Sequence, residues 1–351
     1  MVIRRGRTSG PPCVAVTGAS VGLGRALVER LALRPDLPRL VGLDEVEVAG
    51  QVGLVQWRTG ATPMHERLAG VTTVVHLAMS FDTLAPAPAR RALNVTGTAQ
   101  LLEAALQAGV SRIVLLSSVD VYGASAQIPV PVGAPLLAAP DDSLTGDLVE
   151  LERLADHAGR AGLELVILRP ATVVGGRFGP AYDGALLRSL STGRLLSVRG
   201  VEPLWQLCHV DDLLAALELA AVGAISGVVA VACDGWLTQR EVERLSGRRR
   251  LELPAAVALS TAERLHRIGA TSGSPRELDR LLSPLVVDAA PLRAIGWTSA
   301  WTNAGALAAH LEARPGVPGR AGTYTAAGAS ATVALLGTAA LVRRARARRG
   351  R

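Results

Sequence analysis

Three glycines near the start of the chain have a spacing suited to binding phosphates. They follow an apolar run at 13–17 and lead into an amphipathic stretch, so the sequence predicts a buried strand, a tight turn and a helix entered at its N-terminus. Backbone N–H groups at a helix start lack partners and attract anions, aided by the helix dipole. The pattern therefore predicts a cradle for the pyrophosphate of a dinucleotide, formed by Gly18, Ser20, Val21, Gly22, Leu23 and Gly24.

An acidic residue follows the next strand-like segment. The apolar run 40–43 ends in Asp44, about as far from the glycines as a ribose-binding carboxylate should be. Glu45 comes next, and two acids would repel a 2′-phosphate. We therefore expect Asp44 to contact the cofactor, and NAD to be preferred over NADP. The alternative, a glycine turn without a ligand, requires the strand, the glycines and the acid to coincide by chance.

These residues need a scaffold that brings strand ends together. Apolar, strand-like runs occur at 13–17, 40–43, 52–57, 73–77, 112–117 and 163–168, with helical periodicity at 87–108 and 146–161 between them. The alternation predicts an α/β fold with a doubly wound parallel sheet, the Rossmann arrangement. Right-handed crossovers would place a ligand at the carboxyl ends of the strands.

Composition limits the classes of partner. The 351 residues suffice for one large or two modest domains. Only 3% are aromatic, so stacking platforms for single-stranded nucleic acid are scarce. The net charge of +7 comes from the two ends, since setting aside nine terminal arginines leaves 28 basic residues against 30 acidic ones. We therefore expect no nucleic-acid partner, and only the ends would attract anionic lipid.

The cysteines and the N-terminus suggest a compartment. Cys13, Cys208 and Cys233 are widely separated and lack metal-ligand spacing, which favours core thiols in a reducing environment and no metal site. No apolar segment precedes the first strand, so we expect no signal peptide and a cytoplasmic protein.

The last residues differ from the rest in composition. Residues 315–322 resemble a linker, and 323–342 form an uncharged stretch of bilayer-spanning length followed by six arginines. Because alanine, threonine and glycine dominate that stretch, two interpretations stay open. The tail 323–351 is either a helix anchoring the protein at the inner face of a membrane or a loosely ordered segment.

Seven motifs in order resemble the extended short-chain dehydrogenase/reductase family, the NAD-dependent epimerases and dehydratases. They lie at 17–24, 76–78, 94–98, 116–123, 168–175, 208–213 and 295–297. The resemblance implies further cofactor contacts at Leu77, Ala78, Ser117 and Pro170. It also implies an active-site position for Ser118, a structural role for Asn94 and a ring near the substrate for Tyr122.

Each of the three roles implied for Ser118, Asn94 and Tyr122 has a simpler alternative. Ser118 could cap a helix, Asn94 could bind a neighbouring loop, and Tyr122 could be ordinary packing. The His209, Asp211 and Asp212 cluster resembles a strand end feeding a helix with an Asp as N-cap, which we prefer to a metal site.

The chain departs from this family where catalysis is expected. Gly60 and Ala61 stand where the family commonly has Gly-Asp, which would remove one hydrogen bond to adenine. The family's Tyr-x-x-x-Lys pair aligns with Leu144 and Leu148, and the chain has no lysine at all. A tyrosine without lysine keeps a pKa of about 10 and is a poor base at neutral pH. We therefore expect an NAD-binding protein with impaired or atypical catalysis. The alternative is an active oxidoreductase or epimerase acting on a nucleotide sugar or small carbonyl compound through a non-standard proton donor.

The remaining segments suggest two domains. We expect a dinucleotide-binding domain over 1–176, to which 206–235 return, and a smaller substrate lobe from 177–205 and 236–314. A small-molecule ligand would contact residues of the first insertion, with Arg177, Phe178, Tyr182 and Trp205 as candidates. Association into a homodimer stays open.

Overall fold

The computed structural model describes residues 12–37, 39–45, 55–59, 62–83, 85–175, 187, 190, 194–268, 274 and 278–313. Several predictions concern residues outside these ranges: the linker and tail at 315–351, the departure at Gly60 and Ala61, and the candidate contacts Arg177, Phe178 and Tyr182.

The centre of the molecule is a seven-stranded parallel sheet, which confirms the predicted α/β, doubly wound class. Its strand order is β11-β6-β5-β4-β1-β2-β3. The strands are β1 (Cys13–Thr17), β2 (Arg39–Leu43), β3 (Val55–Arg58), β4 (Thr73–His76), β5 (Arg112–Leu116), β6 (Glu164–Pro170) and β11 (Gly227–Val231). Strand order reverses beside β1, so the carboxyl ends of β1 and β4 flank the position where a doubly wound sheet binds its ligand.

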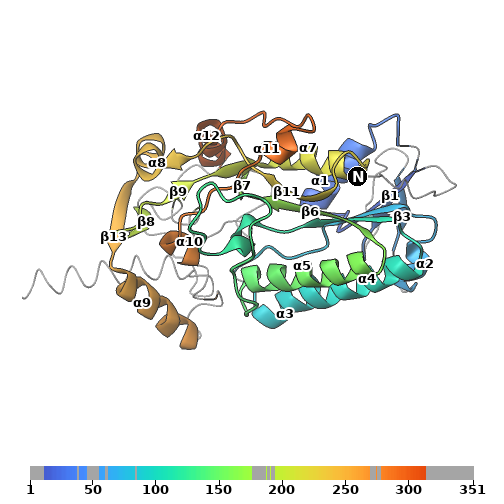
Figure 1. Cartoon of the computed structure of the whole chain (residues 1–351), viewed down its shortest axis with the longest axis horizontal. Helices are drawn as coiled ribbons and strands as arrows, with labels where there is room; N and C mark the ends of the chain where they lie inside the picture. The colour runs from blue at the N-terminus through green and yellow to red at the C-terminus, as the bar shows by residue number, and fades with distance from the viewer. Residues whose placement is uncertain are drawn as a thin grey trace, which may run out of the picture.

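Helices cover both faces of the sheet (Figure 1). One layer contains α1 (Gly22–Leu31), α7 (Val210–Ala221) and α11 (Ala290–Arg293). The other contains α3 (Ala87–Arg91), the π-helical turn η1 (Ala92–Gly97), α4 (Thr98–Gln107) and α5 (Leu144–Arg160). The short helix α2 (Met64–Arg67) follows β3, and the 3-10 turn η2 (Val119–Tyr122) follows β5.

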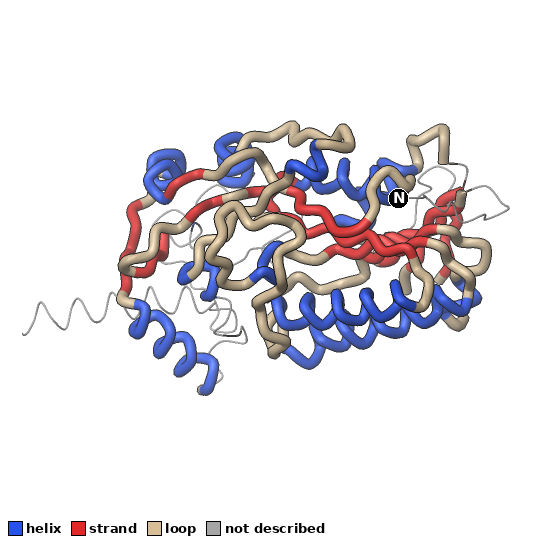
Figure 2. Tube along the Cα trace, viewed as in Figure 1, coloured by secondary structure: helices blue, strands red, loops and turns tan. Residues whose placement is uncertain are grey.

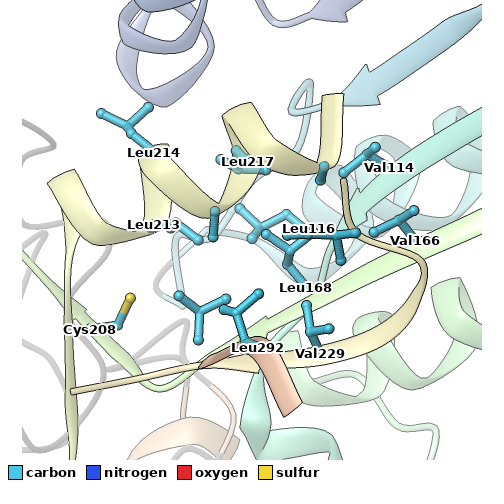
Figure 3. Close-up of a cluster of buried hydrophobic side chains, with 14 of the residues drawn as sticks. Val114, Leu116, Val166, Leu168, Cys208, Leu213, Leu214, Leu217, Val229 and Leu292 are labelled. Atoms are coloured by element: carbon cyan, nitrogen blue, oxygen red, sulfur yellow. The ribbon is translucent and has the colours of Figure 1, made fainter. Parts of the chain in front are cut away.

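Strand residues alternate between the two apolar cores. Val14 and Val16 of β1 pack in the core beneath α1 and α7, whereas Cys13 and Ala15 pack in the core beneath α4 and α5. Figure 3 shows Leu213 and Leu217 of α7 among the side chains of β5 and β6 in the first core. Because both faces are covered, the strands are apolar on both sides, as the continuous runs in the sequence predict.

A smaller C-terminal region has its own core. It contains β8 (Arg194–Val198), β9 (Leu204–Trp205), β12 (Leu237–Thr238), α8 (Gln239–Ser246), β13 (Arg249–Leu253), α9 (Ala255–Arg267), α10 (Asp279–Leu282) and α12 (Asn303–Ala313). Between the two regions, β7 (Thr172–Val174) pairs with β10 (Leu207–His209). Figure 2 shows the short strands of this region at the end of the molecule away from β2 and β3.

Membrane-spanning helices and clusters of metal ligands are both absent from the described residues. None of the helices there combines the length and the apolar character needed to cross a bilayer. Within the same ranges, no group of three or more His, Cys, Asp or Glu side chains lies close enough together to hold a metal ion.

Candidate functional site

The glycine turn after β1 is shaped by close backbone contacts. Gly18 has φ +65°, and a Cβ there would lie 2.9 Å from the backbone nitrogen of Ala78. A Cβ on Gly24 would lie 2.0 Å from the Gly18 carbonyl oxygen, so α1 packs directly on the turn. Gly22 also has a positive φ, +53°. Glycine is therefore required at these points by the path of the backbone.

The start of α1 fits an anionic ligand. Val21 is the N-cap residue, is 70% exposed, and makes no capping hydrogen bond with its side chain. Since no acidic residue occupies the first turn, no carboxylate competes there for its N–H groups. A pyrophosphate is the kind of ligand that such a helix start accepts. The residues present therefore fit the phosphates of a dinucleotide.

Asp44 lies directly beside the glycine turn. Its Oδ2 accepts from the backbone N–H of Ser20 at 2.9 Å, and its Oδ1 accepts from that of Glu45 at 2.8 Å. The Gly18 N–H donates to the carbonyl of Leu43 at 3.0 Å. These bonds hold the carboxylate at the carboxyl edge of β2 with lone pairs to spare for ribose hydroxyls, the contact that the sequence predicts.

A buried polar chain fixes the loop after β4. Thr17 Oγ1 accepts from the N–H groups of Leu77 and Ala78, both at 3.1 Å, so its own proton goes to His76 Nδ1 at 2.7 Å. The His76 proton must then sit on Nε2, which donates to Thr98 Oγ1 at 3.0 Å. Burial lowers the pKa of His76 to about 4, so the ring is neutral at physiological pH. Sequence reasoning found His76 only as part of a motif and missed this role.

Asn94 extends the same chain from η1. Its Oδ1 accepts from the Ser80 N–H and its Nδ2 donates to the Ser80 carbonyl, both at 2.8 Å. Its own carbonyl accepts from the Thr98 hydroxyl at 2.7 Å. Because Asn94 is fully buried, these bonds occupy its side chain. The structure thus matches the loop-binding alternative and gives the residue a positioning role.

Ser118 caps the turn that follows β5. It is the N-cap of η2 and its Oγ accepts from the Asp120 N–H at 3.2 Å. The same hydroxyl donates to Asp120 Oδ2 at 3.1 Å. Asp120 Oδ1 in turn lies 2.9 Å from Nε of Arg280, which belongs to α10. Ser118 is half-buried at the carboxyl edge of the sheet, so both predicted roles, cap and site residue, are compatible with its position.

The hydroxyls of Ser117 and Tyr122 bond within the core, and for Tyr122 this matches the packing alternative. The Ser117 hydroxyl donates to Glu152 Oε1 at 2.6 Å, and the Tyr122 hydroxyl donates to the Val132 carbonyl at 2.8 Å. Both residues are fully buried, and their predicted contacts with cofactor and substrate stay predictions. Burial also raises the pKa of Tyr122, which makes it a still weaker base. Arg169 ties the cluster together, because it pairs with Glu152 at 2.5 Å and lies over the Tyr122 ring.

The start of α5 is apolar at Leu144 and Leu148, the two positions aligned with the family's Tyr-x-x-x-Lys pair in the sequence analysis. Ser143 caps the helix by accepting from the Gly146 N–H at 3.0 Å. Leu144 is the first helical residue, and Leu148, one turn later, is fully buried. Between them Asp147 forms a buried ion pair with Arg90 at 2.8 Å. The helix α5 also contacts η2, the turn that Ser118 caps.

The His209 and Asp212 cluster is structural, as the sequence indicates, although the capping residue differs from the prediction. His209 is the N-cap of α7, since its Nδ1 accepts from the Asp211 N–H at 3.2 Å, and its ring stacks on Trp301 at 3.9 Å. The Asp212 carboxylate instead binds the 299–301 segment, accepting from the Ser299 hydroxyl at 2.6 Å.

Trp205, a predicted pocket contact, is buried within the C-terminal region. It is 1% exposed, and its Nε1 donates to Gln239 Oε1 at 2.8 Å inside the C-terminal region. An indole of that volume between β9 and α8 fills the core of the lobe and cannot line a pocket. The sequence predicted a ligand contact for Trp205 because of its place in the first insertion. In the structure this large side chain is packed in the core of the lobe instead.

Curated proteins similar to this chain include long and shorter matches. The chain is 29% identical to an uncharacterized protein of Mycobacterium tuberculosis over 324 residues, covering 87% of this chain and 84% of that protein. It is also 29% identical to a UDP-glucose 4-epimerase of Vibrio cholerae, over 52% of this chain and 58% of that one.

Solved structures share the fold. MoeE5 in complex with UDP-glucuronic acid and NAD is similar with a TM-score of 0.63 and 25% identity, over 86% of this chain and 98% of that one. A UDP-glucose 4-epimerase of Thermotoga maritima with UDP-glucose gives a TM-score of 0.62 at 18% identity, over 86% and 97%, a likeness of fold alone.

A family model matches more than half of the chain. The model for the "NAD dependent epimerase/dehydratase family" matches residues 14–227, a range that includes the glycine turn, Asp44, the His76 chain, Ser118 and α5. The glycine geometry, the parallel sheet and this match agree, and the chain belongs to the NAD dependent epimerase/dehydratase family.

Proposed function

We propose that this chain binds NAD at the glycine turn and a nucleotide-linked sugar beside it, and that it lacks the family's usual means of proton transfer. The turn supports the first part, because backbone contacts at Gly18 and Gly24 leave room for no side chain. Family membership and the NAD and sugar nucleotide named for MoeE5 support the ligands. NAD itself would supply hydride transfer; Gly18 to Gly24 and Asp44 would hold it.

One observation carries the proposal of impaired or atypical catalysis. The chain contains no lysine, so no alignment can restore a Tyr-x-x-x-Lys pair. Leu148, at the position that corresponds to the lysine, is fully buried, and Leu144 begins the helix one turn earlier. Hydrocarbon at both positions can neither move a proton nor lower the pKa of a phenol.

Calorimetry tests the proposed binding. NAD and NADH are titrated separately into the full chain, then UDP-glucose is titrated into the NAD complex. We expect saturable binding of NAD, with NADP bound more weakly because of Asp44 and Glu45. A chain that binds neither NAD nor NADH would contradict the proposal.

A second function, atypical oxidation or epimerisation, is favoured by the carboxylate beside Ser118. Asp120 is 35% exposed, lies 3.1 Å from the Ser118 hydroxyl, and is an ionisable group at the edge where a ligand is expected. Nicotinamide absorbance is followed across a panel of nucleotide sugars and small carbonyl compounds. Turnover that Ser118→Ala abolishes would support this function. A flat trace, or turnover undiminished in Ser118→Ala, would count against it.

A further inference from the structure

We propose that Asp120 fixes the hydrogen-bonding polarity of Ser118, so that this site accepts the hydroxyl form of its ligand and rejects the carbonyl form. The inference rests on the proposed function in one respect, since it requires that the ligand reach Ser118. It adds Asp120 as a specificity-determining residue. It also names the chemical class of the ligand group that binds Ser118, a hydroxyl.

The argument is a count of hydrogen-bonding capacity. A serine hydroxyl has one proton and two lone pairs. The Ser118 proton is directed to Asp120 Oδ2 at 3.1 Å, because a carboxylate can only accept. One lone pair accepts from the Asp120 backbone N–H at 3.2 Å. A single lone pair is left. Ser118 can therefore accept a hydrogen bond from a ligand but has no free proton with which to donate one.

Arg280 forms an ion pair with this carboxylate that does not have hydrogen-bond geometry. Its Nε lies 2.9 Å from Asp120 Oδ1, leaving Oδ2 for the serine. The guanidinium is anchored as well, since its Nη1 donates to the Leu285 carbonyl at 3.3 Å. Arg280 is 16% exposed and comes from the C-terminal region, so that region contributes a charge beside the turn that follows β5. The positive charge beside Oδ1 favours the orientation in which Oδ2 faces Ser118.

The class of ligand follows from the remaining lone pair. A secondary alcohol of a sugar can donate to it, whereas a ketone oxygen would meet it acceptor to acceptor. A missing hydrogen bond at a partly buried site lowers affinity by roughly ten-fold. We expect the alcohol to be favoured over an acceptor-only analogue by about that factor.

Asp120→Asn should reverse the polarity. Arg280 is a donor only, so it selects the amide oxygen of the new side chain and turns the amide nitrogen toward Ser118. Ser118 then accepts from that nitrogen and from the backbone N–H, and its own proton becomes available to a ligand. The substitution keeps the shape of the side chain while exchanging an acceptor for a donor.

The test compares two probes in the presence of NAD, UDP-glucose and UDP-4-deoxy-4-fluoroglucose, by calorimetry. Position 4 is chosen because relatives include a UDP-glucose 4-epimerase, and fluorine cannot donate. The wild-type chain should prefer UDP-glucose by about ten-fold, and Asp120→Asn should reduce that ratio to about one or below. Asp156→Asn, an exposed carboxylate on α5, is the matched control and should keep the wild-type ratio. An unchanged ratio in Asp120→Asn would overturn the inference.

A ligand-free measurement separates this inference from the proposed function. If UDP-glucose does not bind the NAD complex at all, the proposed sugar ligand is wrong, and Ser118 is then judged by neutron diffraction of the deuterated protein. The deuteron on Ser118 Oγ should lie on the line to Asp120 Oδ2. A deuteron pointing in any other direction would overturn the inference.

Discussion

The two sides of the predicted site present different kinds of groups, backbone on one side and side chains on the other. On the β1 and β4 side, the glycine turn, the Thr17 to Asn94 chain and Asp44 present backbone N–H groups and fixed loops. On the β5 side, the Ser118 and Asp120 pair lies on η2, and α5, which contacts η2, begins with Leu144 and carries the buried Leu148. The first side depends on the path of the backbone and the second on side-chain identity. A chain can thus keep the family's binding shape while its reactive groups change.

The largest expected effect concerns the turn. Gly24→Ala places a Cβ 2.0 Å from the Gly18 carbonyl oxygen, so α1 must move off the turn. We expect a loss of about 4 kcal/mol in the free energy of unfolding and loss of NAD binding, measured by urea denaturation and calorimetry. Gly133→Ala is the control, since its Cβ meets nothing within 4 Å. Wild-type stability and affinity in Gly24→Ala would show that the turn does not depend on this contact.

The next largest effect on stability concerns the buried ion pair between Glu152 and Arg169. Glu152→Gln leaves Arg169 buried without its charge partner and weakens the acceptor of the Ser117 hydroxyl. Breaking a buried pair of this kind costs about 3 kcal/mol of unfolding free energy. Asp156→Asn breaks an exposed pair with Arg160 on the same helix and should change it by less than about 0.5 kcal/mol. Equal effects in the two variants would mean that the Glu152 pair contributes no more than a surface contact.

His76 gives the β4 side a pH dependence. Its pKa is about 4 in the folded chain and 6.5 when unfolded, so the unfolded state binds the extra proton between these values. Stability should be fully present above about pH 6.5 and fall with pH, by about 3 kcal/mol from this residue at pH 4. Its ring partners, Thr17 and Thr98, do not ionise in this range.

Urea denaturation from pH 7 to pH 4 measures that slope. His76→Gln should flatten it while lowering stability at pH 7, because the acceptor for Thr17 is lost. His157→Gln, at an exposed position on α5, serves as the control and should leave the slope unchanged. A wild-type slope in His76→Gln would assign the pH dependence to other groups.

The smallest expected effect concerns the proposed contact between Asp44 and the adenosine ribose of NAD. Asp44→Asn keeps an acceptor for the Ser20 N–H but removes the charge that ribose hydroxyls would meet. We expect NAD affinity to fall by about ten-fold and discrimination against NADP to narrow, measured by calorimetry. Glu45→Gln should alter NAD affinity by much less. Unchanged NAD affinity in Asp44→Asn would place the ribose contact elsewhere.

Backbone-determined features were predictable from the sequence. The parallel sheet follows from apolar runs alternating with helical periodicity, and the need for glycine at 18 and 24 follows from strand-turn-helix geometry. Both depend on residues close together in the chain, where spacing carries the information. The predicted domain boundaries, the cytoplasmic location and the role of the tail stay predictions.

Features made by distant side chains were not predictable. Asp120 and Arg280 are far apart in sequence, and nothing near either one indicates the other. The same holds for Glu152 and Arg169, whose pairing draws Ser117 and Tyr122 into the core. A single sequence shows which residues can ionise, but it does not show which of them the folded chain brings together.

The most direct test of the central claim is a crystal structure of the full chain with NAD. We expect the pyrophosphate at the start of α1, the adenosine ribose at Asp44, and the nicotinamide end near Ser118 with the hydrocarbon of α5 beside it. A turn filled by the protein's own side chains, or NAD bound at another place, would contradict the account.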